Sequence, residues 1–391
     1  MQLNEAKTSN EEKLTHLEHA EDHVINAGAD GYTHAKNSLM AVHGALTGNA
    51  PSNASITTKY DGSPSIVFGR HPETGKFFVA SKSAFNKNPK INYTEDDIEA
   101  NHGHAPGLVE KLKAALKYLP KVTPSEGVYQ GDVMHTGVKS KSNPIGDVEL
   151  KDGVAHFKPN TITYTAPEDE TDAVKKSKFG VAVHTSYHGP SFDQMKASFN
   201  TDVGDFKPHK DVHMIDVHHD LDGVEYTPAQ QSAFESYMKN AEAAHKNLLD
   251  GGYEAAGGRH VDLLKTYINK TVRTGAEPSV EGYQAHLRDE GEKAAGKVKT
   301  LATQEKRRGE YNGMIADVEK NKPHFGNLLS LHANLQQAKN QLTHALSSHS
   351  RYGHFIGDKE TKPEGFVVSL NNRPTKLVDR AAVSYTHLTL P

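Results

Sequence analysis

The segment 57-TTKYDGSPSIVFG-69 places Lys59, Asp61 and Gly62 directly before a run that is predicted to be a strand, Ser65–Arg70. A lysine attacks a phosphate only when its amine is deprotonated and held against that phosphate, and burial or a neighbouring cation lowers a lysine pKa readily. Asp61 would orient Lys59, and Gly62 would let the backbone approach a sugar or a base closely. The same residues also suit a solvent-exposed hairpin edge, so the interpretation depends on residues farther along the chain.

Composition limits the classes of protein to which the chain can belong. Its 391 residues suffice for two or three domains, and a hydrophobic fraction of 35% with a net charge of −4 is unlike that of disordered chains. Because there is no overall basic excess, contact with nucleic acid would need a local basic patch. The lack of cysteine excludes disulfides, thiolate metal sites and cysteine catalysis.

The sequence shows no sign of membrane association or export. No apolar run approaches membrane-spanning length, and Met1–Asn10 lacks the apolar core of a signal peptide. We therefore expect a cytoplasmic protein without a membrane partner, located in the host cytoplasm if a phage encodes it.

Short apolar runs separated by turn residues dominate residues 51–222. Ser65–Arg70 and Lys76–Lys82 are two such runs joined by HPETG, which predicts a β-hairpin. Gly127–Val133 and Lys178–Thr185 are predicted to be further strands, the second of them buried. This part of the chain is therefore expected to form a β-rich core.

The period of the hydrophobic pattern changes near Thr227, where apolar residues begin to recur at spacings of three and four. Helices are predicted over Val261–Val272, Val280–Ala302 and Pro323–Ser348. Strand character returns at Gly365–Leu370. A helical block thus interrupts a β-rich chain.

The expected fold class is α+β, with a core of antiparallel sheets and an inserted helical domain. Val383–Pro391 resembles translated sequencing-adapter DNA, so the native sequence is expected to end near Ala382 and the native C-terminus to be missing. The expected segments are an N-terminal helical segment at 1–50, core at 51–222, helical domain at 223–350, closing core strands at 351–382 and a non-native tail at 383–391.

Several side chains downstream of Lys59 suit phosphate chemistry. Attack on an α-phosphate depends on positioning and charge neutralisation, which carboxylates provide through Mg²⁺ and lysines provide directly. Side chains of these kinds, with one aromatic ring, occur in order at Ser81, Lys82, Asp132, Phe179, Glu364 and Lys376. Each also has a structural interpretation, as a strand-end carboxylate, a core phenylalanine or a surface lysine.

The order of these pieces resembles the motif order of the covalent nucleotidyltransferases, the superfamily of ATP-dependent DNA ligases, RNA ligases and mRNA capping enzymes. The resemblance implies an ATP-grasp-like ligase adenylation core and an ATP- and Mg²⁺-dependent reaction on RNA or DNA ends through a lysyl-AMP intermediate. It implies that Lys59 is the nucleophile and that Asp132 and Glu364 bind Mg²⁺. The nucleotide-binding residues that it implies are Thr58, Asp61, Gly62, Ser81, Lys82, Phe179 and Lys376.

A second resemblance covers more of the chain, namely most of residues 11–220 and then 364–380. The stretches that carry it resemble uncharacterised proteins of large tailed phages, and they are Leu14–His19, Phe85–Lys90, Tyr129–Asp132 and Phe157–Thr161. The likeness to ligases is confined to the short motifs.

Some positions depart from the ligase pattern. Pro64 stands at the position where the ligase pattern has an arginine. Thr57 and Thr58 stand where that pattern has an acidic residue shortly before the lysine. The second lysine of the closing motif is not evident at Val378. The alternative is therefore a catalytically inactive phage structural or interaction protein that keeps the fold and uses the helical insertion as a surface for a protein partner.

Two further polar stretches have both a functional and a structural interpretation. The histidines at 213, 218 and 219 would either bind a metal or lie on a polar edge strand. The basic residues between Lys297 and Arg308 would either hold a nucleic-acid backbone or form a solvated helix face, and interrupting glutamates favour the second interpretation.

Overall fold

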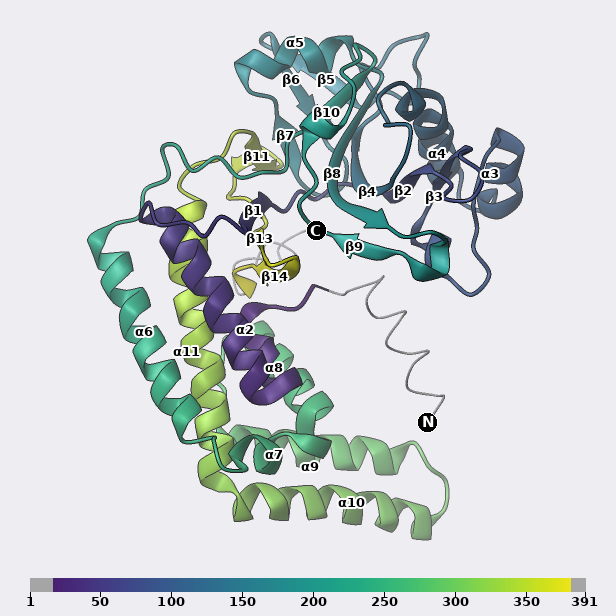
Figure 1. Cartoon of the computed structure of the whole chain (residues 1–391). Helices are drawn as coiled ribbons and strands as arrows, with labels where there is room; N and C mark the ends of the chain where they lie inside the picture. The colour runs from purple at the N-terminus through teal and green to yellow at the C-terminus, as the bar shows by residue number, and fades with distance from the viewer. Residues whose placement is uncertain (1–16, 381–391) are drawn as a thin grey trace. The chain divides into compact units, whose positions relative to one another are not determined.

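The computed structural model describes residues 17–380, which separate into two compact units (Figure 1). One unit contains Ser55–Asp222 and His349–Pro374 and holds most of the strands. The other contains Glu18–Ala54, Gly223–Ser348 and the described chain from Thr375, and it is mainly helical. The tail expected at 383–391 lies outside the described residues. None of the helices within 17–380 is both long and apolar enough to cross a membrane.

A six-stranded sheet forms the centre of the first unit. Its order is β10-β8-β4-β2-β3, with β9 paired to β8, and its neighbours are antiparallel except for the parallel pair of β8 and β10. The bounds are β2 (Ser65–Arg70), β3 (Phe77–Ala80), β4 (Val128–His135), β8 (Phe179–His188), β9 (Lys196–Ser198) and β10 (Val212–Ile215).

Helices cover this sheet because the apolar face of each helix and the inward-facing side chains of the strands share one core. Helix α4 (Pro106–Tyr118) buries Leu112 and Ala115 in the same cluster as Phe68 and Val133 of the sheet. Helix α3 (Glu95–His102) begins at Thr94, whose side chain accepts a hydrogen bond from the Asp97 N–H and so caps the helix.

A five-stranded sheet joins chain from before and after the long helices. Its order is β12-β11-β7-β6-β5, and β7 pairs antiparallel with β11. Tyr60, Phe157, Tyr164 and Tyr352 share its core, together with Val174 of α5 (Glu168–Lys176). The bounds are β5 (Val148–Lys151), β6 (Val154–Phe157), β7 (Thr163–Thr165), β11 (Gly353–Ile356) and β12 (Lys359–Glu360).

The smallest sheet brings the strand before Lys59 beside the strand after Glu364. Its order is β1-β13-β14, with bounds β1 (Ala54–Thr58), β13 (Phe366–Leu370) and β14 (Arg373–Leu377). Asn371 and Asn372 connect β13 to β14 with φ angles of 52° and 59°. Asparagine tolerates this left-handed region, as a two-residue hairpin turn requires.

The helical unit is built around α11, which packs against α6 and α2. Leucines at 328, 335 and 342 of α11 are buried, as their spacing predicts. Helices α9 and α10 lie side by side (Figure 1). The bounds are α2 (His23–Leu46), α6 (Pro228–Lys246), α7 (Gly252–Ala256), α8 (Val261–Thr274), α9 (Val280–Gly296), α10 (Leu301–Lys320) and α11 (Lys322–Leu346).

The α+β class and the antiparallel sheets are confirmed, but the predicted helix Val280–Ala302 is wrong at its end. Helix α9 stops at Gly296, and Thr300 then caps α10 by accepting a hydrogen bond from the Thr303 N–H at 3.3 Å. The hydrophobic pattern gave no sign of a separate α10, because Val318 is its one buried residue.

Candidate functional site

Lys59 and Glu364 form an ion pair at one end of the three-stranded sheet. Lys59 follows β1 and Glu364 lies two residues before β13, and the Lys59 N–H donates to the Gly365 carbonyl at 2.9 Å. This backbone contact brings the two side chains together, so that Nζ of Lys59 lies 2.6 Å from Oε2 of Glu364. The side chains are 29% and 18% exposed, which leaves the pair accessible to a ligand from solvent.

Asp61 fixes the loop after Lys59 and does not contact the Lys59 amine. Its carboxylate accepts hydrogen bonds from Asn160 Nδ2 at 2.9 Å, the Thr161 N–H at 3.0 Å and the Ile162 N–H at 3.4 Å. The Asp61 N–H donates to the Tyr164 hydroxyl at 2.7 Å. Burial raises the pKa of Tyr164, so its hydroxyl stays protonated. The expectation that Asp61 orients Lys59 directly is therefore wrong, and its oxygens are engaged by the segment before β7.

Gly62 packs directly against the strand that carries Asp132. A β-carbon at residue 62 would lie 2.5 Å from Cβ of Asp132 and 2.8 Å from Sδ of Met134, so any larger residue would displace the loop. The next residue, Ser63, donates its N–H to the Val133 carbonyl at 3.0 Å. Asp132 is thus held beside the loop that begins at Lys59.

The Asp132 carboxylate is only lightly engaged. Its contact within residues 17–380 is His184, whose Nε2 lies 3.8 Å from Oδ2 of Asp132. The His184 Nδ1 lies 2.8 Å from the Thr185 hydroxyl, which fixes the ring. Because Asp132 is 22% exposed, its oxygens are available to a ligand or cation.

Ser81 lies at the same end of the six-stranded sheet as Asp132. Ala80, the last residue of β3, pairs with Val67 of β2, and Ser65 of β2 pairs with Asp132. Ser81 follows Ala80 and caps the short helix Lys82–Phe85, accepting a hydrogen bond from the Ser83 N–H at 3.3 Å. The exposed Lys82 begins that helix.

Three other predicted nucleotide-binding residues lie in different surroundings. Thr58 is 8% exposed, and its hydroxyl lies 3.0 Å from Nδ1 of His219. Phe179 is fully buried in the core beneath α4, so its ring has no free face on which a base could stack. Lys376 belongs to the helical unit, where its N–H donates to the Glu18 carbonyl at 2.9 Å.

Lys111 was not predicted from sequence, although it supports the loop after Lys59. Its Nζ donates to the Ser63 carbonyl at 2.6 Å, and burial lowers the pKa of its ammonium. Helix packing brings Lys111 to the loop, and strand pairing brings His184 to Asp132, in each case between distant segments. Their positions in the sequence carry no motif that could have identified them.

One comparison with known proteins places the chain in a family. The model described as "Family of unknown function (DUF6267)" matches residues 10–391. The chain belongs to this family. No curated protein and no solved structure matches it. The matched range includes Lys59, Asp132 and Glu364, and the family description assigns them no role.

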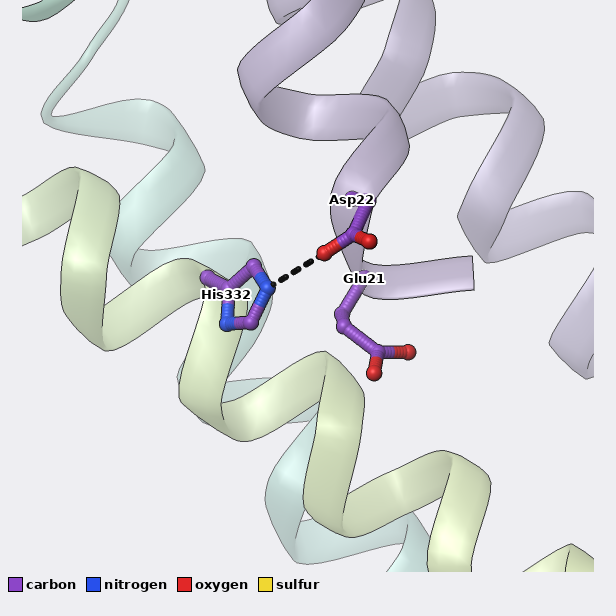
Figure 2. Close-up of side chains that lie close together, drawn as sticks. All are labelled: Glu21, Asp22 and His332. Atoms are coloured by element: carbon purple, nitrogen blue, oxygen red, sulfur yellow. Dashed lines mark hydrogen bonds and ion pairs between the residues drawn. The ribbon is translucent and has the colours of Figure 1, made fainter. Parts of the chain in front are cut away.

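A buried group of two carboxylates and a histidine lies in the helical unit (Figure 2). Glu21 and Asp22 come from the 3₁₀ helix Ala20–Asp22, and His332 of α11 places Nε2 2.9 Å from Oδ1 of Asp22. One potential ligand atom from each residue lies within 4.8 Å of the others.

Two cations already balance these carboxylates. Lys339 Nζ lies 2.7 Å from Oε1 of Glu21, and Arg380 Nη1 lies 2.9 Å from Oδ1 of Asp22. Burial alone would raise the pKa of Glu21, but the charge of Lys339, together with His19 and His332, lowers that pKa overall. A bound dication would therefore add uncompensated buried charge, and we interpret the group as a structural ion network.

The three histidines between residues 213 and 219 do not converge. His213 contacts Glu170 at 2.9 Å, His218 contacts Asp216 at 3.0 Å and His219 contacts Thr58 at 3.0 Å. Because each ring has a different partner, they do not form a shared metal site. His213 lies on β10, an edge strand as the alternative interpretation expected.

A row of three paired residues crosses the six-stranded sheet at His135, Gly180 and His213. A β-carbon at Gly180 would lie 2.2 Å from the His135 ring, so glycine leaves the space through which this ring reaches His213. The Gly137 N–H donates to Nδ1 of His135 at 3.3 Å, which places the proton of a neutral His135 on Nε2. That Nε2 lies 3.2 Å from Nδ1 of His213, whose own Nε2 then donates to Glu170.

Proposed function

We propose that the chain is a covalent nucleotidyltransferase with the corresponding fold, which uses ATP and Mg²⁺ to adenylate Lys59 and passes the adenylyl group to an RNA or DNA end. The observation that supports this best is the 2.6 Å contact between Lys59 and Glu364, residues 305 positions apart in sequence. Asp132 lies against the loop that begins at the same lysine. A nucleophile and two acidic side chains are thus associated with one partly exposed loop.

The pair places a proton acceptor beside an amine that must lose a proton before it reacts. In the proposed step, a bond forms between Lys59 Nζ and the α-phosphorus of ATP while the bond from that phosphorus to the pyrophosphate oxygen breaks. The ammonium of Lys59 first gives up a proton, and Oε2 of Glu364 is the carboxylate oxygen in position to accept it.

The acidic residues fit a magnesium ion by their chemistry. Mg²⁺ prefers carboxylate oxygens, and Asp132 has oxygens that the described residues leave largely free. Asp132 and Glu364 would hold the ion, which would supply charge neutralisation for the phosphates.

The surrounding residues would keep this loop in place. Asp61 ties it to the segment before β7, and Lys111 holds the Ser63 carbonyl at 2.6 Å. Ser81 and Lys82, at the same end of the sheet, are available for ribose or phosphate. A fixed loop lowers the entropy lost when the reacting atoms are aligned.

Labelling with radioactive nucleotides tests the proposal. The full chain is incubated with Mg²⁺ and each α-³²P-labelled ribonucleotide, then separated by denaturing electrophoresis. We expect a labelled protein band with ATP that disappears in Lys59→Ala and persists in Lys76→Ala, which removes an exposed lysine on the turn between β2 and β3. A folded protein that takes up no label from any nucleotide would contradict the proposal.

The structure offers little to favour the alternative of an inactive interaction protein. Between residues 223 and 348, the large apolar side chains that are exposed are Leu249 and Leu301, at 45% and 76%. Two single leucines are ordinary for a protein surface and do not make a docking patch.

A further inference from the structure

A cavity of about 410 Å³ opens beside the edge strand β10, lined by residues between Val203 and Met214. None of the residues in the proposed nucleotidyltransferase site lines it. Its volume is at the lower end of the range of small-molecule sites. The cavity therefore calls for an explanation separate from the reaction at Lys59.

The cavity has an apolar wall and a basic rim. Phe206 and Val212 are buried members of the sheet core, and Met214 packs partly buried against them. Lys207 and Lys210 are exposed, and within residues 17–380 neither forms an ion pair. A ligand that suits both surfaces combines an apolar group with negative charge.

The His209 ring adds a hydrogen-bond donor to the cavity. The Asp211 N–H donates to Nδ1 of His209 at 3.1 Å, so the proton of a neutral His209 lies on Nε2 and is available to a ligand. The Asp211 carboxylate is paired with Lys121, its Oδ2 also lies 3.8 Å from Nδ1 of His209, and it interacts electrostatically with Lys210 without forming an ion pair with it. Both ring nitrogens of His213 are already engaged, by His135 and Glu170.

Backbone hydrogen bonds fix the segment that lines the cavity. The Lys207 N–H donates to the Val122 carbonyl at 2.8 Å, and the Lys178 N–H donates to the Asp211 carbonyl at 2.8 Å. The Val212 N–H closes a turn by donating to the His209 carbonyl at 3.0 Å. Because these contacts fix the segment, a ligand would lose little affinity to ordering the loop.

We propose that this cavity binds a small organic anion, with its charged group on Lys207, Lys210 and His209 and its apolar group against Phe206 and Met214. The donors would recognise a phosphate or carboxylate group. The apolar wall would favour an anion with a short hydrocarbon or aromatic body over a bare inorganic ion.

Methionine methyl NMR tests this binding on the full chain. With [¹³C-methyl]methionine, Met214 reports on the cavity, while Met134 and Met195 are buried elsewhere in the same unit and serve as internal controls. Met214→Leu assigns the reporter signal. The probes are phenyl phosphate, benzoate, inorganic phosphate and neutral phenol.

We expect phenyl phosphate or benzoate to shift the Met214 signal saturably, at least about tenfold more tightly than phenol or inorganic phosphate. The relative affinity of phenyl phosphate and benzoate identifies the preferred charged group. Lys207→Gln with Lys210→Gln should weaken the binding at least about tenfold. The control pair Lys76→Gln with Lys176→Gln removes the same charge from exposed sites and should change the affinity less than about twofold.

Three results would overturn the proposal. These are no Met214 shift with either organic anion at millimolar concentration, equal affinity for phenol, or equal weakening by the control pair. The first would show that the cavity is not a binding site, and the other two would show that the anion is not recognised by the basic rim.

Discussion

Removing one partner of the ion pair between Lys339 and Glu21 tests whether the buried carboxylates of the helical unit belong to a structural ion network. Both side chains are 0% exposed, and Nζ lies 2.7 Å from Oε1. Lys339→Met keeps most of the aliphatic stem and removes the charge, which leaves the Glu21 carboxylate buried with Arg380 as its nearest remaining cation, 3.6 Å away. Removing one partner of a buried pair typically costs about 3–5 kcal/mol.

Urea unfolding followed by far-UV circular dichroism measures this loss. With a urea dependence of about 1–3 kcal/mol per molar, the midpoint should fall by at least about 1 M. The double variant Glu21→Leu with Lys339→Met removes both charges, and we expect it to recover most of the lost stability. Lys246→Met, which removes the exposed partner of Glu242 at 3.1 Å, is the control and should change the midpoint far less.

The pH dependence of the single variant adds an independent check. Without Lys339, burial raises the pKa of Glu21 above its unfolded value, so the penalty of the variant is present at neutral pH and shrinks as Glu21 is protonated on acidification. A loss below about 1 kcal/mol, or a double variant as unstable as the single one, would refute the reasoning, because charge burial would then not control this site.

Three further predictions concern the six-stranded sheet, helix α5 and helix α6. Gly180→Ala would place a β-carbon 2.2 Å from the His135 ring, so the free energy of unfolding should fall by about 1–3 kcal/mol. An unchanged urea midpoint would mean that the His135 ring does not need the space that Gly180 leaves. Burial alone would raise the pKa of Glu170, but hydrogen bonds from His213, Tyr352 and Arg351 lower it to about 2. The ionised carboxylate therefore stabilises the fold at pH values above its unfolded pKa, and this contribution is lost as the pH falls toward 2. Glu170→Gln should therefore flatten the decline in stability between about pH 5 and pH 2, and equal slopes in both proteins would exclude this role. Thr227 caps α6 through the Gln230 N–H, and Thr227→Ala should cost about 1 kcal/mol in thermal unfolding, whereas an unaltered melting temperature would mean that the cap is not needed.

Periodicity and turn chemistry predicted much of the fold from the sequence. The strand Ser65–Arg70 and the long helix near Pro323–Ser348 were predicted from local hydrophobic patterns, and the structure has them at nearly the same positions. The end of α9 was missed because no proline marks the break between the helices at Lys297–Thr300, and because α10 has almost no buried face. The hydrophobic pattern alone contains little information on such weakly buried helices.

The candidate site was predictable only as a set of residue types. The sequence identified Lys59 and Glu364 separately, but their contact depends on pairing between strands that are far apart in the chain. Asp61 was expected to orient the lysine, yet its partners come from the segment at Asn160–Ile162, which no local rule connects to it. Phe179 was expected to contact the nucleotide because it is aromatic, but its burial in the sheet core accounts for an aromatic residue at this position.

Strand β7 is synthesised before the long helices and its partner β11 after them, so the two strands can pair only late in protein synthesis. The same delay applies to the ion pair between Lys59 and Glu364. Glu364 leaves the ribosome about 15–60 s after Lys59, because 305 residues separate them and translation adds about 5–20 residues per second. Until β11 emerges, the nascent chain carries β7 with an open edge, which is a template for pairing with another chain. Chaperone protection of the nascent β-strands is therefore most valuable while the ribosome is translating the helices α6 to α11.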